Sequence, residues 1–262
     1  MTKPAPGSTG PTRTEIASGV HRLGDNTVNF YLVEDEDGLT LVDTGLPRHF
    51  GGLQAVLERL GRTPGDIRAV LLTHAHPDHT GLAERLRRAG AEIWIHERDA
   101  ASLGDGPRSA MRHAKPERSL LPYLLRRPAA LGAPLHLARG GAFTAPAVEK
   151  AHRFGAAGLP ATLPGGPRAV PVPGHTPGST AYLFAERGLL FTGDALVTYD
   201  GLTGHTGPTL VARGFTHNSA AALASLDLLS GPAGALVLPG HGAPFTDGPR
   251  AAVERAREAG RH

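Results

Sequence analysis

Residues 70–79 read Val-Leu-Leu-Thr-His-Ala-His-Pro-Asp-His, and this stretch decides the fold. Its first three residues are apolar and predict a buried strand. Three imidazoles and one carboxylate follow within six positions. Pro77 argues against a helix there, because its ring removes a backbone donor. The segment is therefore predicted to be a tight loop at a strand end, able to point several metal-binding side chains into one site.

Three further metal-binding side chains stand alone in the second half of the chain. His175 lies in Pro-Gly-His-Thr-Pro-Gly, Asp194 in Thr-Gly-Asp-Ala and His241 in Pro-Gly-His-Gly. Each follows a glycine that allows tight backbone geometry, shortly after a strand-like segment. Any one of them alone is typical of a turn or surface residue. Beside the dense cluster at 74–79, they complete a set of nitrogen and oxygen ligands large enough for two metal ions, each with a position open for water or substrate.

The composition restricts the type of metal site. The chain has 262 residues, of which 40% are hydrophobic and 19% charged, as expected for a globular protein with a sizeable core. It has no cysteine, which excludes disulfides and thiolate zinc sites. The ligands must therefore be imidazole and carboxylate. We expect two divalent metal ions, zinc first, with iron or manganese compatible with the same ligand types.

Charge and hydropathy indicate the partners to expect. The net charge is +3, from 27 basic and 24 acidic residues, with no long block of like charges. This pattern favours neither nucleic acid nor a membrane surface as a partner. The first residues lack the apolar stretch of a signal peptide, and no apolar run approaches the ~18 residues of a membrane span. We expect a cytoplasmic protein that acts on a small molecule, as a monomer or a homodimer.

The remaining patterns predict one domain over residues 13–262, preceded by a disordered tail at 1–12 rich in Pro, Gly, Ser and Thr. Strand patterns alternate with helix patterns on both sides of a break at about 104–166. That break is predicted to be a mostly helical insertion or lid, with helical patterns around 120–125 and 147–154. Later helices are predicted at 219–229, with Asn218 as N-cap, and at 248–259.

These motifs resemble the signature of the metallo-β-lactamase-fold hydrolases, from about Val20 to Phe245. That signature is a His-x-His-x-Asp-His loop followed by separate His, Asp and His ligands in this order. The resemblance implies an α/β (α+β) fold, a four-layer αβ/βα sandwich with the site at one edge of its two sheets. It also implies the ligand assignment. One metal takes His74, His76 and His175, the other takes Asp78, His79 and His241, and Asp194 bridges the two.

Within this resemblance the chain differs from several known branches. β-Lactamases of the fold do not usually carry an aspartate at the position of Asp194, and flavodiiron members typically have Glu where His76 stands. Glyoxalase II-type thioesterases share the ligands but carry a long helical extension, whereas 21 residues follow His241 here. Acyl-homoserine lactonases usually place a Tyr where this chain has Val197. Tyr199 is a candidate to replace it.

The resemblance implies a hydrolase in which a hydroxide bridging two metals attacks the carbonyl of an ester, lactone or thioester. Asp78 is expected to orient that hydroxide and to carry a proton to the leaving group. Asp43, in Leu-Val-Asp-Thr-Gly, is expected to orient a ligand histidine or the 74–79 loop. Tyr199, His205 and His217 are candidates to line the substrate pocket.

Other reactions on the same fold remain open. The main alternative is an oxidoreductase similar to persulfide dioxygenases, with a single iron at the first set of histidines. The complete second set favours the hydrolase. A β-lactamase is disfavoured by Asp194, and a nuclease by the balanced charge.

Overall fold

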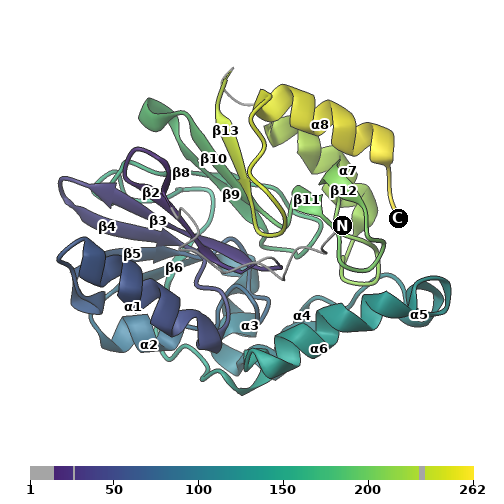
Figure 1. The fold of residues 1–262 in the computed structure, drawn as a ribbon, viewed down its shortest axis with the longest axis horizontal. Coiled ribbons are helices and arrows are strands. Elements are labelled where there is room, and N and C mark those ends of the chain that lie inside the picture. Colours follow the sequence, from purple (N-terminus) through teal and green to yellow (C-terminus); the bar gives the residue numbers. More distant parts are fainter. Residues whose placement is uncertain (1–14, 26, 230–233) are drawn as a thin grey trace, which may run out of the picture.

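A computed structural model describes residues 15–25, 27–229 and 234–262. The predicted tail at 1–12 lies outside the described residues. The elements form two main sheets with helices on their outer sides (Figure 1).

The larger sheet has seven strands in the order β1-β2-β3-β4-β5-β6-β7. Their bounds are β1 Glu15–Ala17, β2 Val20–Gly24, β3 Asn29–Asp35, β4 Gly38–Val42, β5 Ile67–Leu71, β6 Glu92–His96 and β7 His152–Phe154. The first four strands are antiparallel neighbours, and β4 to β7 are parallel. Hairpins build the first half of this sheet, and helical crossovers build the second half.

The second sheet has four strands in the order β13-β10-β9-β8, and β11 and β12 form a separate pair. Their bounds are β8 Arg168–Pro171, β9 Thr180–Phe184, β10 Leu189–Gly193, β11 Val197–Tyr199, β12 Thr206–Thr209 and β13 Leu236–Pro239. β10 and β13 are parallel, so the residues that follow these two strands emerge on the same side.

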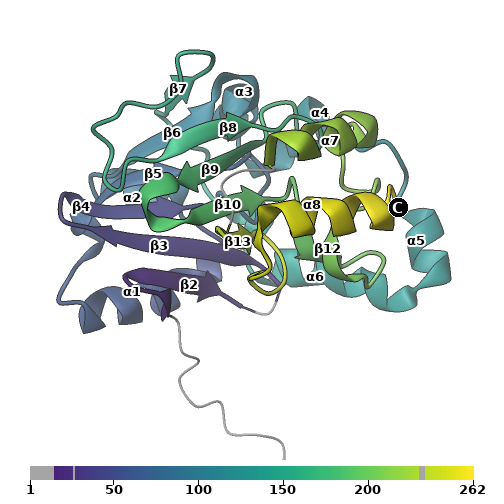
Figure 2. The same ribbon diagram turned by 90° about the horizontal axis from the view of Figure 1, so that it is seen from above.

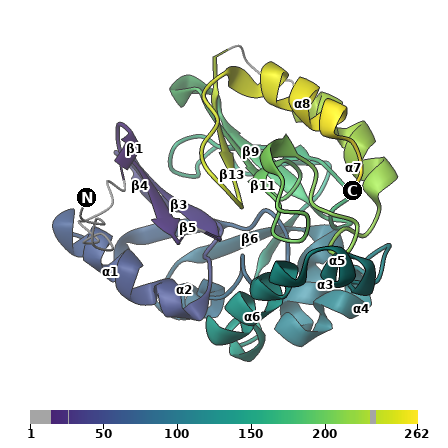
Figure 3. The ribbon, with the colours of Figure 1, turned by 45° about the vertical axis from the view of Figure 1, so that its right-hand side comes forward.

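Helices cover the outer face of each sheet, as Figure 3 shows. The larger sheet is covered by α1 (Phe50–Arg59), α2 (Ala83–Arg88) and α3 (Glu97–Asp105). The second sheet is covered by α7 (Ser219–Ser225) and α8 (Gly248–Ala259). Asn218 caps α7 as predicted, because its side chain accepts a hydrogen bond from the Ala221 amide at 2.9 Å.

Three buried clusters mark the three layer boundaries. One lies between the larger sheet and its helices and includes Leu41 and Leu57. A second joins the two sheets through aromatic residues such as Tyr182 and Phe191. The third lies beneath α7 and α8 and includes Val237. The predicted four-layer αβ/βα sandwich is confirmed, because each sheet is apolar on both faces and needs cover on both.

The predicted insertion contains α4 (Ala110–His113), α5 (Leu121–Arg126), α6 (Gly132–Arg139) and short 3-10 turns. Figure 2 shows α5 and α6 at one end of the sandwich, where β12 and the C-terminus also lie. The Tyr123 hydroxyl donates to the carbonyl of His262 at 2.9 Å and joins the insertion to that end.

The prediction of a helix around 147–154 is wrong. Residues 152–154 form β7, which pairs in parallel with β6, and Phe154 packs between the two sheets. Local apolar spacing predicted a helix, but pairing with a strand distant in sequence decided the conformation. Across the described ranges, no helix is both long and apolar enough to span a bilayer.

Candidate metal centre

The structure brings all seven predicted ligands together. The 74–79 loop follows β5 of the larger sheet. The other three side chains follow strands of the second sheet: His175 follows β8, Asp194 follows β10, and His241 follows β13. The site is therefore formed by loops from both halves of the sandwich.

The side chains fall into three overlapping groups whose ligand atoms lie within 4.8 Å of one another. The first group is His74, His76 and His175, the second is Asp78, His79 and His241, and the third joins His74, His79 and Asp194. The third group thus contains one histidine from each of the other two groups and the carboxylate of Asp194.

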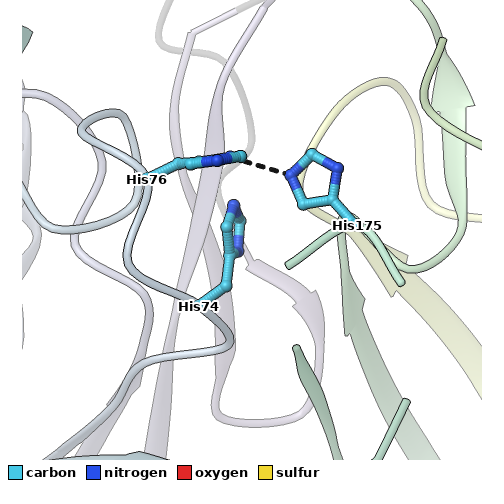
Figure 4. A group of neighbouring side chains, drawn as sticks. All are labelled: His74, His76 and His175. Atoms are coloured by element: carbon cyan, nitrogen blue, oxygen red, sulfur yellow. Dashed lines mark hydrogen bonds between the residues drawn. The ribbon is translucent and has the colours of Figure 1, made fainter. Parts of the chain in front are cut away.

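Figure 4 shows how the first group converges. His76 presents Nδ1 to Nε2 of His175 at 2.8 Å, and the ring of His74 lies at right angles to both. Three imidazoles at this spacing, with nitrogens turned toward one space, form the usual nitrogen donor set of a metal site.

Asp194 lies between the two groups. Its Oδ2 is 3.4 Å from Nε2 of His175 and 3.1 Å from Nε2 of His241. Its Oδ1 is 3.4 Å from Nε2 of His79. One carboxylate therefore faces ligands of both groups, which is the position that a bridging ligand needs.

Unpartnered atoms point into this space. Among the described residues, five buried side-chain atoms have no hydrogen-bond partner, and three of them belong to this cluster. They are Nε2 of His74, Nε2 of His79 and Oδ1 of Asp194. Buried polar atoms are rarely left unsatisfied, and three side by side indicate a missing cationic partner.

Asp43 holds the opposite side of this cluster in place. Its Oδ2 accepts hydrogen bonds from Nδ1 of His79 and from the Thr73 hydroxyl, both at 2.8 Å, and its Oδ1 accepts from the Thr73 amide at 2.8 Å. The proton on Nδ1 of His79 leaves Nε2 free to bind a metal. Asp43 is also the one non-glycine residue of the described ranges with positive φ, at 59°.

His241 is oriented by the β2–β3 connection. Its Nδ1 donates to the carbonyl of Thr27 at 2.5 Å, which leaves Nε2 facing Asp194. Asp25 holds that connection, since its Oδ1 accepts from the amides of Thr27 and Val28. No sequence pattern singled out Asp25 or Thr27 for this role.

The electrostatics divide the histidines into two classes. Burial and neighbouring histidines hold the pKa values of His74 and His175 well below the ordinary value, so both stay neutral. Burial also disfavours charge on His79, but the carboxylates of Asp194, Asp78 and Asp43 outweigh it and raise the pKa to about 9. Burial is likewise outweighed at His241, where Asp194 and Asp78 raise the pKa to about 10. The carboxylates thus make the second group an anionic pocket that favours a cation.

Asp99, on α3, is the residue of the site that the sequence analysis missed. It is 3% exposed, and its carboxylate accepts from the Ala75 amide at 3.1 Å, the Gly178 amide at 2.7 Å and the Thr176 hydroxyl at 2.7 Å. It therefore joins the loop of His74 and His76 to the loop of His175. In the sequence, an Asp in the first turn of a helix is indistinguishable from one that stabilises the helix dipole.

Two glycines leave room for the centre. A Cβ at Gly240 would lie 2.4 Å from Oδ1 of Asp194, and one at Gly193 would lie 2.5 Å from the Thr73 hydroxyl. Gly193 also has a positive φ of 50°. A side chain at either position would clash with these neighbours, which explains why glycine precedes Asp194 and His241.

A cavity of about 320 Å³ opens beside the cluster. Its lining includes His76, Asp78, His175, Asp194 and His241, and also Tyr199. The other two residues predicted to line it do not belong to its walls. The ring of His205 lies 5.6 Å from that of His262, and His217 donates to the Lys115 carbonyl at the surface. The His217 amide donates to the carbonyl of His175 at 3.0 Å, so its backbone lies beside the centre although its side chain does not line the cavity.

Comparison with known proteins is consistent with this geometry. The family model of the metallo-beta-lactamase superfamily matches residues 23–241. The uncharacterized protein YobT of Bacillus subtilis (strain 168) is 33% identical over 88% of each chain. The probable metallo-hydrolase YqgX of the same organism is 27% identical over 86% of this chain and 89% of its own. The solved structure of TTHA1623 in a di-iron-bound form is 27% identical, with a TM-score of 0.60, and covers 88% of this chain and 95% of that one. With its His/Asp cluster formed at the edge of a four-layer sandwich, the chain belongs to the metallo-beta-lactamase superfamily.

Proposed function

We propose that the protein is a hydrolase with two metal ions that cleaves a carbonyl ester, lactone or thioester of a small molecule. One observation carries the proposal. Three buried ligand atoms without hydrogen-bond partners, on His74, His79 and Asp194, face one another between two complete sets of three ligands. A site with one metal would leave Asp78 and His241 without a function in the cluster.

The donor set fits two divalent ions. His74, His76 and His175 would hold one, Asp78, His79 and His241 would hold the other, and Asp194 would contact both. Zinc suits imidazole and carboxylate donors, and iron or manganese suits them as well. Bound metals of this kind polarise a carbonyl and make hydroxide available as nucleophile near neutral pH.

The chain's own residues supply orientation and proton transfer. Asp78 lies at the cavity wall, with Oδ2 3.5 Å from Nε2 of His241. From there its carboxylate reaches both the ligands and the substrate space. We assign to it the orientation of the attacking water and the transfer of a proton to the leaving group. We assign to Tyr199, which lines the same cavity, a hydrogen bond to a substrate oxygen.

Elemental analysis of protein purified without chelator or added metal tests this proposal. Two equivalents of zinc, or of another divalent metal, per chain are expected, together with turnover of members of a panel of lactones, thioesters and esters. One equivalent of iron with the second group empty would overturn it in favour of persulfide oxidation, which would then be assayed as oxygen uptake. A β-lactam in the same panel tests the disfavoured lactamase activity.

A further inference from the structure

We propose that the substrate carries an uncharged apolar chain and that the cavity beside the metal centre holds this chain during the reaction. The inference rests on the proposed hydrolase function and adds the substrate class to it. The cavity has two chemically different ends. One is the His/Asp cluster, and the other is formed by side chains of the insertion and of the loop after β12.

The far end is apolar. Its wall includes Met111 of α4, Ala133 and Leu137 of α6, and Phe143 from the turn that follows. Val211 and Phe215 close the other side. Side chains of this type stabilise a ligand by removing its hydrocarbon from water, and they offer no hydrogen bonds to a polar group.

Two charged residues line the cavity outside the cluster, and neither is a buried charge without a hydrogen-bond partner, since Asp200 is hydrogen-bonded and Arg108 is exposed. The Asp200 carboxylate is 3% exposed and accepts hydrogen bonds from the amides of Leu202, Thr203 and Ala212. Arg108 uses its Nε to donate to the carbonyl of Phe143 at 3.2 Å. A carboxylate or ammonium group on the chain would therefore lose hydration with little compensation.

Two wall residues are also open to solvent. Met111 is 65% exposed and Phe143 is 40% exposed, although both contribute to the cavity. Large apolar side chains that are exposed at the rim of a cavity are typical of a binding site. An apolar chain that enters past them would cover part of this surface.

The cavity size limits the chain length. A volume of about 320 Å³ lies at the small end of the range of about 300–1,000 Å³ that ligand pockets occupy. The reacting carbonyl takes part of that space. We therefore expect selectivity to rise with chain length and to level off once the chain fills the cavity.

The first test measures binding without chemistry. Straight-chain carboxylates from acetate to decanoate are titrated calorimetrically into the full-length, zinc-loaded protein. Affinity is expected to rise about fourfold per methylene, which is about 0.8 kcal/mol, until the cavity is full. The α,ω-dicarboxylates of equal length are expected to bind more weakly. Affinity that is independent of length, or tighter binding of the dicarboxylates through Arg108, would overturn the inference.

The second test places the chain in the cavity by substitution. Ala133→Phe adds a ring to the cavity wall, whereas Ala138→Phe adds the same ring to an exposed position of the same helix. The octanoate-to-acetate affinity ratio is expected to fall at least tenfold in Ala133→Phe and to stay unchanged in Ala138→Phe. Equal ratios in both variants, with both folded by circular dichroism, would show that the chain lies elsewhere.

Hydrolysis of matched acyl thioesters separates this inference from the proposed function. Length-dependent carboxylate binding without turnover of any thioester, lactone or ester would overturn the hydrolase and leave the apolar site standing. Turnover that is independent of acyl length would support the hydrolase and overturn the apolar site.

Discussion

At the scale of single residues, hydrogen bonds to groups outside the ligand set decide which nitrogen of His79 and of His241 faces the site. His79 is the clearest case, because Asp43 accepts a hydrogen bond from its Nδ1, and the amide and hydroxyl of Thr73 donate to the same carboxylate. The positive φ of Asp43 is tolerated because both sides of its carboxylate are held. Without such partners, a ligand histidine would be free to rotate or change tautomer.

Asp43→Asn should weaken metal binding. The amide nitrogen cannot accept a hydrogen bond, so either Thr73 or His79 loses its acceptor. We expect a roughly 10- to 100-fold loss of metal affinity, measured by competition with a chromogenic chelator. Asp37→Asn, in the exposed β3–β4 turn, is the matched control and should leave affinity unchanged. Equal affinities in the two variants would remove Asp43 from the ligand-orienting role.

Asp99→Asn should loosen two ligand loops at once. The amide keeps one acceptor oxygen where the carboxylate serves three donors. The free energy of unfolding should fall by about 1–3 kcal/mol, and metal affinity should fall with it. Urea unfolding of the metal-free protein and metal titration measure the two effects separately. Reduced stability with unchanged metal affinity would make Asp99 purely structural, and Asp105→Asn on the same helix is the control.

At the scale of elements, a buried carboxylate holds a helix that is too short to be stable alone. α2 has six residues, too few to be stable alone. Its Glu84 is 2% exposed and accepts from Arg87 at 2.7 Å, from Arg88 at 2.7 Å and from the Glu149 amide at 3.2 Å. This carboxylate thereby joins α2 to the segment that leads into β7.

The Arg87 guanidinium, with smaller contributions from the Glu149 amide and Arg88, overcomes burial and lowers the pKa of Glu84 to about 2. Because the folded pKa is depressed, the stabilisation is complete above the unfolded value of about 4.5 and is lost as pH falls toward 2. Glu84→Gln should lower the free energy of unfolding by about 1–3 kcal/mol at pH 7. In urea unfolding, that difference from wild type should shrink between pH 5 and pH 3. A difference independent of pH, or an equal loss in the exposed Glu258→Gln, would contradict this account.

At the scale of the whole molecule, the candidate metal centre joins the two halves of the sandwich. Its ligands come from the loop after β5 and from loops after β8, β10 and β13. Metal that binds the folded state alone adds to the free energy of unfolding, by about 2.7 kcal/mol at a hundredfold excess over Kd.

Chelation should therefore lower the Tm by roughly 5–10 °C relative to the zinc-saturated protein, as measured by scanning calorimetry. His241→Ala should reduce this zinc-dependent shift, since it removes a ligand of the second group and leaves the first group intact. His217→Ala is the matched control and should retain the full shift, because His217 contacts the Lys115 carbonyl at the surface. A full zinc shift in His241→Ala would exclude this residue as a ligand.

The sequence by itself determined the elements whose signals are local. α8 begins and ends as predicted at Gly248 and Ala259, β9 occupies Thr180–Phe184, and the 74–79 loop follows its strand. The seven candidate ligands were also recognisable, because metal binding requires specific donor atoms and their spacing is unusual.

The tertiary structure alone decided what depends on residues far apart in the chain. β7 is a strand because β6 lies beside it, and Asp99 matters because Ala75 and Gly178 meet at its carboxylate. The cavity wall combines α4 and α6 with the loop after β12, so Tyr199 faces it while His205 and His217 do not. Such contacts depend on how the layers of the fold pack together. The propensity and residue spacing of a single segment carry no information about that packing.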